Sequence, residues 1–238
     1  DGQKLMVQVL NRDQNDMRFI LADVTTGDYT EVYRETRPTW VDFFEDIHVM
    51  SDGSGFIVRS YRNDWYNLYW YGWDGVLRSQ ITDFDWKVNS IVKVDEARGE
   101  IYFNGTGPDA LDNHLYRVRL DGTRLLKVTD GRGYHSASVS PGGSWFLDSW
   151  SSLESPGSID LIDRRGRKVR TIHTADSPAF DAGMHQRQEL VTIRSADGLF
   201  DMPALITYPV SFDPAKRYPV IFTIYGGPDA GSIRNRSE

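Results

Sequence analysis

Short apolar runs alternate with glycine turns through residues 1–175. Four apolar triplets each follow a turn, at residues 5–7, 56–58, 101–103 and 145–147. Four further runs end in a turn glycine, at Gly27, Gly75, Gly122 and Gly166. Because these glycines lie 48, 47 and 44 residues apart, the pattern predicts an internal repeat of one structural unit.

Each repeat is interpreted as four strands, with one strongly apolar hairpin and one that alternates. In residues 116–120, apolar side chains alternate with arginines, which is typical of a half-exposed strand. A four-stranded unit of roughly 45 residues has the size of a β-propeller blade. The triplets suit strands covered on both faces. We expect the innermost strands near residues 5–9, 56–60, 101–103 and 145–149. The alternative is a β-sandwich, which the regular glycine interval disfavours.

A different pattern follows the repeat. Residues 176–195 contain polar residues with Pro and Gly breakers, which suits a connector between domains. Two apolar runs then flank Asp197-Gly198 and predict a strand pair. Residues 219–228 predict a buried strand that ends at a Gly-Gly-Pro turn, with Tyr225 at its tip.

Three motifs in this second region carry a resemblance: residues 197–209, residues 213–219 and the sequence Tyr-Gly-Gly-Pro at 225–228. Together they resemble the entry to the catalytic domain of the prolyl oligopeptidase family of serine peptidases, most closely its dipeptidyl peptidase IV branch. The resemblance implies an eight-bladed propeller followed by an α/β-hydrolase domain. We therefore expect an all-β fold. A partial propeller of about four four-stranded blades, the C-terminal half of a larger propeller, occupies residues 1–175. The connector and first strands of a truncated hydrolase domain occupy residues 176–238.

The resemblance also assigns candidate site residues. In that family the tyrosine of the Tyr-Gly-Gly-Pro motif donates a hydrogen bond to the oxyanion, a role that falls on Tyr225 here. Trp40 and Phe44 lie where the family's propeller lends an aromatic wall to the substrate cleft. Both are candidate substrate-binding residues, with ordinary core packing as the alternative.

The residues that would perform the reaction are absent from this sequence. The chain has no cysteine, and Ser144 is the only serine with a glycine two places before it. Phe146 stands where a G-x-S-x-G nucleophile elbow needs its second glycine, so Gly142-Gly143-Ser144 is interpreted as a hairpin turn. We expect a non-catalytic fragment of a serine exopeptidase, inactive alone. The resemblance implies that its parent removes amino-terminal dipeptides with proline or alanine second. The alternative is a self-standing β-propeller that binds peptide or protein.

Composition limits the partners. The net charge is −7 with both signs mixed along the chain, which gives no basis for binding nucleic acid. No apolar run approaches the ~20 residues that cross a bilayer, so we expect no membrane contact from this segment. Residues 11–16 lack the glycine and distal glutamate of a calcium loop. We expect no metal and no cofactor, and a peptide substrate in the parent.

Two expectations concern assembly and location. Four blades of a larger ring would leave open apolar sheet faces, so we expect a homo-oligomer. The resemblance favours a periplasmic or secreted protein.

Overall fold

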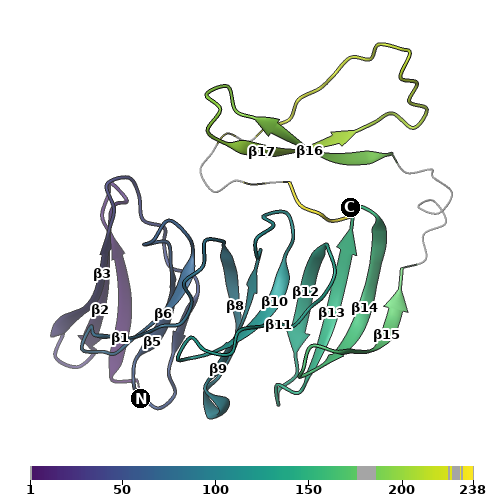
Figure 1. The fold of residues 1–238 in the computed structure, drawn as a ribbon. Helices are drawn as coiled ribbons and strands as arrows, with labels where there is room; N and C mark the ends of the chain where they lie inside the picture. Colours follow the sequence, from purple (N-terminus) through teal and green to yellow (C-terminus); the bar gives the residue numbers. More distant parts are fainter. Residues whose placement is uncertain (1, 176–185, 225, 227–230, 232, 238) are drawn as a thin grey trace.

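The chain is almost entirely β-structure. The computed structural model describes residues 2–175, 186–224, 226, 231 and 233–237. In these residues the strands form five antiparallel sheets, with one short 3-10 turn, η1 (Glu96–Arg98). Four sheets lie side by side in the order of the chain, and a separate hairpin lies apart from them (Figure 1).

The sheets follow the order of the chain. The first sheet contains β1 (Lys4–Leu10), β2 (Asp16–Asp23) and β3 (Tyr29–Thr36). The second contains β4 (Ile47–Val49), β5 (Phe56–Ser60), β6 (Asn67–Tyr71) and β7 (Leu77–Gln80). The third contains β8 (Val88–Asp95), β9 (Glu100–Gly105), β10 (His114–Arg119) and β11 (Leu126–Lys127). The fourth contains β12 (Tyr134–Val139), β13 (Trp145–Ser152), β14 (Ser155–Asp163) and β15 (Lys168–Thr174). The hairpin pairs β16 (Gln188–Arg194) with β17 (Asp201–Thr207).

The glycine repeat marks one place in every sheet, the turn between the last two strands. All four glycines there have φ between 75° and 80°, a left-handed conformation that glycine adopts without steric cost. An aspartate one to four residues before each glycine accepts a backbone N–H group in the turn, as Asp121 does from Thr123 at 3.0 Å. The predicted internal repeat is therefore confirmed.

The position of the apolar triplets differs from the expectation. The triplets lie in β1, β5, β9 and β13, and the last three of these strands are second in their sheets, behind β4, β8 and β12. The prediction that the triplet strands lie innermost is wrong for residues 56–60, 101–103 and 145–149, because the pattern missed an edge strand in each of these three sheets. The first sheet shows three strands, and these correspond to the second to fourth strands of the other sheets.

Three hydrophobic cores lie between successive sheets. Alternate residues of one strand serve two cores, since Phe56 and Val58 pack against the first sheet while Ile57 packs against the third. In β9, Phe103 faces the second sheet and Tyr102 the fourth. A sandwich has a single core between two sheets. The sequential cores show blades of a β-propeller, as predicted.

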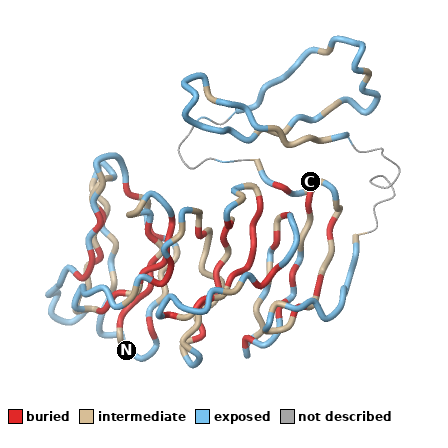
Figure 2. The backbone as a smooth tube through the Cα atoms, viewed as in Figure 1, coloured by how far each residue is buried: buried red, intermediate tan, exposed pale blue. Residues whose placement is uncertain are grey.

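The end sheets have one covered face each. The triplets of β5 and β9 are completely buried, whereas Leu5 and Val9 of β1 and Trp145 and Leu147 of β13 are exposed. Figure 2 shows that the buried residues concentrate in the four sheets and that the hairpin is largely exposed. The strands β1 and β13 are thus apolar on both faces, but the described sheets of this chain bury only one face of each.

The hairpin β16–β17 confirms the strand pair predicted around Gly198, whose φ is 73°. The predicted strand at residues 220–224 is wrong for this structure. These residues have no strand structure, and Val220, Ile221, Phe222 and Ile224 are 71% to 91% exposed. A strand needs a neighbouring strand for its backbone hydrogen bonds, and none of the described strands pairs with these residues.

In the described part of the chain, no helix is long and apolar enough to cross a membrane.

Candidate functional site

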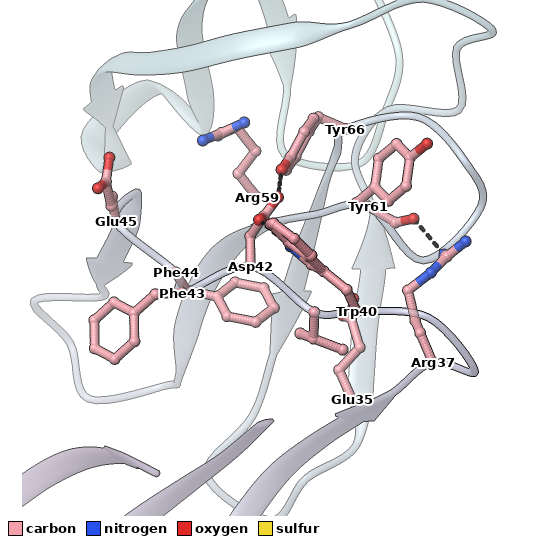
Figure 3. Close-up of a pocket in the computed structure, with 11 residues that line it drawn as sticks. Glu35, Arg37, Trp40, Asp42, Phe43, Phe44, Glu45, Arg59, Tyr61 and Tyr66 are labelled. Carbon is pink, nitrogen blue, oxygen red and sulfur yellow. Dashed lines mark hydrogen bonds between the residues drawn. The ribbon is translucent and has the colours of Figure 1, made fainter. Parts of the chain in front are cut away.

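A hollow opens beside the first and second sheets, between residues 37–46, which connect β3 to β4, and the loop from β5 to β6. Its cavity volume is about 10 Å³, which is room for about one water molecule. Aromatic and charged side chains surround it (Figure 3). The lining residues are Glu35, Arg37, Trp40, Val41, Asp42, Phe43, Phe44, Glu45, Arg59, Tyr61 and Tyr66.

Asp42 joins the two walls of the hollow. One carboxylate oxygen accepts a hydrogen bond from Nε1 of Trp40 at 2.6 Å, and the other accepts from the hydroxyl of Tyr66 (Figure 3). Trp40 remains 45% exposed. The hydrogen bond fixes the indole ring while nearly half of the residue stays exposed, which suits contact with an apolar or aromatic group.

Two arginines cover the aromatic rings of the hollow. The guanidinium of Arg59 lies 4.2 Å from the ring centroid of Tyr66, and its Nε donates to Asp46 at 2.8 Å. Arg37 lies 4.9 Å from the ring centroid of Tyr61 and donates to the carbonyl of Tyr61 at 2.7 Å. Such cation–π contacts stabilise both partners. The hollow is therefore a fixed arrangement.

Phe44 lies in the core, below the hollow. It is 6% exposed, and its ring packs edge-on against Phe19 with centroids 5.2 Å apart. Gln8 of β1 holds the backbone there, donating to the carbonyl of Phe44 at 2.8 Å and accepting from its N–H at 3.1 Å. Trp40 and Phe44 thus line one hollow in different ways: Trp40 at the surface and Phe44 as its support. Tyr225 lies outside the described residues.

A buried polar cluster lies beside the hollow and was not predicted from the sequence. The carboxyl group of Glu35 accepts from the hydroxyls of Tyr33 and Ser60, both at 2.5 Å, and Arg62 donates to the hydroxyls of Tyr33 and Tyr71. Burial, together with the charge of Glu35, raises the pKa of Tyr33. The only sign of this cluster in the sequence is an acidic and a basic residue, Glu35 and Arg62, close to apolar and aromatic strands.

The described residues offer the hollow no nucleophile. Ser144 lies in the turn before β13, where its N–H donates to Oγ of Ser140 at 3.2 Å, so its interpretation as a hairpin turn is confirmed. His135 pairs with Asp148 at 2.7 Å, but both are buried between the third and fourth sheets, and Nε2 of His135 has no hydrogen-bond partner. A catalytic triad needs a serine at that nitrogen.

Metal binding finds no support in the described residues, which contain no group of three or more histidine, aspartate or glutamate side chains able to hold an ion.

Comparison with known proteins agrees with this fold. The sequence model of the protein family described as the dipeptidyl peptidase IV N-terminal region matches residues 1–157. A protein named "Probable dipeptidyl-aminopeptidase B" from Emericella nidulans is 32% identical over 163 residues, covering 66% of this chain and 18% of that protein. Dipeptidyl peptidase 4 of Arthroderma otae is 26% identical over 238 residues, covering 95% of this chain and 30% of that protein.

A solved structure is similar over almost the whole chain. Dipeptidyl peptidase 4 of Porphyromonas gingivalis superposes with a TM-score of 0.84 at 23% identity, covering 99% of this chain and 34% of that one. This likeness supports the fold. The chain spans about a third or less of the length of these relatives.

Sequential blades with an aromatic hollow define a β-propeller segment with a following hairpin. The match over residues 1–157 identifies it further: the chain belongs to the dipeptidyl peptidase IV family, within the prolyl oligopeptidase family.

Proposed function

We propose that this chain is the propeller-and-junction segment of a serine-type dipeptidyl peptidase, which removes amino-terminal dipeptides with proline or alanine in the second position. The family match over residues 1–157 carries this proposal. The order of the chain supports it, since the hairpin β16–β17 and the Tyr-Gly-Gly-Pro motif follow the blades.

In this proposal the segment supplies walls and one hydrogen-bond donor. Trp40 contacts a bound peptide from the propeller side, and Phe44 supports the wall from below. Tyr225 donates its hydroxyl to the oxyanion, where a donor fixed before the reaction stabilises charge that develops only in the transition state. The serine, histidine and acid of the triad come from other parts of the full-length protein, because this sequence lacks a G-x-S-x-G elbow.

The test is an assay of the full-length protein on chromogenic dipeptide substrates. We expect release of the chromophore from Ala-Pro and Gly-Pro derivatives with a free amino terminus, and none from the same derivatives with an acetylated amino terminus. A fluorophosphonate probe should block the activity by labelling the protein. Hydrolysis of the acetylated substrates, or no hydrolysis of either kind, would reject the proposal. The outcome of no hydrolysis would favour the peptide-binding module instead.

A further inference from the structure

Residues 234–237, which follow the Tyr-Gly-Gly-Pro motif in the sequence, contact the sheets, and Asn235 makes the buried contact. Its backbone N–H donates to the carbonyl of Leu111 at 2.8 Å. Its Nδ2 donates to Oδ1 of Asp112 at 2.9 Å, and its Oδ1 accepts from the N–H of Leu153 at 3.2 Å. With 7% of its surface exposed, Asn235 is buried.

Loops from two different sheets form the binding position of Asn235. Leu111 and Asp112 lie in the loop between β9 and β10 of the third sheet, and Leu153 lies in the turn between β13 and β14 of the fourth. In Figure 1 this end of the chain lies beside the end of the fourth sheet. One side chain therefore fixes the segment against the junction of two blades.

The carboxyl group of Asp112 is held in place by residues of the sheets themselves, independently of residues 234–237. Oδ1 of Asp112 also accepts from the N–H of Gly133 at 3.1 Å, and Oδ2 pairs with Nε of Arg132 at 2.6 Å. Asp112 is itself buried. Since its carboxyl group is oriented by these contacts, Asn235 meets a preformed acceptor. Preformed partners lower the entropic cost of an interaction.

Neighbouring residues strengthen the contact. The guanidinium groups of Arg234 and Arg236 lie 5.4 and 5.6 Å from the ring centroid of Tyr134. The hydroxyl of Ser237 donates to the carbonyl of Pro156 at 3.3 Å. The contact thus extends over four consecutive residues, with Asn235 as its buried centre.

We propose that Asn235 is a positioning residue of the peptidase: it fixes the chain that follows Tyr225 on the propeller and thereby helps to hold the oxyanion donor in place. The inference rests on the proposed function. Nine residues lie between Tyr225 and Asn235 in the sequence, and the hairpin β16–β17 precedes Tyr225. A segment fixed at its far end has fewer conformations than a free one.

Asparagine suits this position because it donates to Asp112 and accepts from Leu153 at once. Alanine loses both side-chain hydrogen bonds. Since a displacement of about 1 Å can lower catalysis by roughly 10²-fold, we expect Asn235→Ala to lower kcat of the full-length protein by roughly ten- to a hundredfold. KM for the dipeptide substrate should change by less than about threefold, because Asn235 does not contact the substrate in this proposal.

The matched control is Ser140→Ala. Oγ of Ser140 accepts from the N–H groups of Ser144 and Trp145 at 3.2 and 3.1 Å, in the turn at the opposite end of the fourth sheet. Both variants remove two side-chain hydrogen bonds: Asn235→Ala loses one to the third sheet and one to the fourth, and Ser140→Ala loses two in the fourth. We expect similar falls in Tm from the two variants, and wild-type kcat from Ser140→Ala.

A double variant with Tyr225→Phe separates positioning from general damage. If Asn235 acts through the Tyr225 hydroxyl, adding Asn235→Ala to Tyr225→Phe should lower kcat by less than about threefold more. Multiplied losses in the double variant, or a kcat of Asn235→Ala within twofold of the wild type, would overturn the inference.

Trypsin digestion gives a readout that does not depend on activity. Arg234 and Arg236 flank Asn235 and are exposed, but the backbone between them is held by Asn235. Release of the segment should free this backbone for the protease, so mass spectrometry should find faster cleavage at both sites in Asn235→Ala than in Ser140→Ala. Equal rates would show that Asn235 does not anchor the segment and would overturn the inference. If wild-type protein releases no dipeptide, the proposed function fails together with the positioning role, while faster cleavage would still show the anchor.

Discussion

At the scale of single residues, Tyr225 carries the part of the proposal nearest to the chemistry. We expect Tyr225→Phe in the full-length protein to lower kcat by roughly 10²–10³-fold, the typical effect of losing one oxyanion donor. KM should change little, since the hydroxyl acts mainly in the transition state. Steady-state kinetics on an Ala-Pro substrate measures both.

Circular dichroism and Tm of the same variant provide the control, and both should match the wild type. A variant with wild-type turnover would show that Tyr225 is not the oxyanion donor.

His114 predicts a dependence of stability on pH. Its ring is buried, Nδ1 lies 3.1 Å from Oγ1 of Thr129, and its centroid lies 4.7 Å from that of His135. Burial first, and then the charge of His135, lower the pKa of His114 from 6.5 to about 3. The unfolded chain therefore binds more protons between these values, and the stability that the neutral ring provides at neutral pH is lost as pH falls from 6.5 towards 3.

The slope from this residue is at most about 1.4 kcal/mol per pH unit. We expect His114→Gln to lose less Tm than the wild type between pH 7 and pH 4.5, as measured by thermal unfolding at both values. Identical losses in the two proteins would contradict the assignment to His114.

Residue roles were only partly predictable from sequence. Trp40 and Phe44 were both identified as candidates, and both line the hollow, yet only the structure distinguishes the exposed ring from the buried one. Gln8 and Glu35 could not be identified, because their roles depend on Phe44 and Ser60, which lie 36 and 25 residues away along the chain. Local patterns do not encode such distant partners.

At the scale of elements, the turn glycines also determine how one blade meets the next. A Cβ atom on Gly122 would lie 3.2 Å from the carbonyl oxygens of Gln80 and Ile81 in the preceding blade, whereas a Cβ on Gly27 meets nothing within 4 Å. Both glycines have positive φ, at 80° and 77°. An alanine at either position would therefore adopt the same unfavourable backbone conformation. Only at Gly122 would its Cβ atom also come close to the preceding blade.

We expect Gly27→Ala to cost about 1–2 kcal/mol, the cost of the left-handed conformation alone. Gly122→Ala adds a close contact with backbone atoms, so its Tm should fall several degrees further than that of Gly27→Ala. Differential scanning calorimetry of the two variants measures the difference. Equal shifts would mean that the blades do not pack through this turn.

Turn chemistry explains why the repeat was predictable and some strands were not. Gly27, Gly75, Gly122 and Gly166 need positive φ, a local requirement that the sequence displays. Strand β12, Tyr134–Val139, is rich in small and polar residues and forms because it pairs with β13. Residues 220–224 show the opposite case, since an apolar pattern without a partner strand stays irregular.

At the scale of the whole molecule, the open faces of the first and fourth sheets predict association. Leu5 and Val9 on one face, and Trp145 and Leu147 on the other, are exposed apolar residues at positions that are buried in the middle blades. We expect the 27.2 kDa chain to form larger species as its concentration rises, as measured by sedimentation velocity.

Charged substitutions test which surface is responsible. The double variant Leu5→Glu/Leu147→Glu should shift the population towards the monomer. A chain that remains a monomer at all concentrations would contradict this prediction.

The most direct test of the whole account is a crystal structure of the full-length protein with a covalent inhibitor that mimics the tetrahedral intermediate. The account predicts that residues 1–175 form consecutive blades of the propeller beside the bound inhibitor. It also predicts that the hydroxyl of Tyr225 lies about 2.7–3.1 Å from the inhibitor's oxyanion. A Tyr225 hydroxyl beyond hydrogen-bond distance of that oxygen, or buried in the hydrolase core, would contradict it.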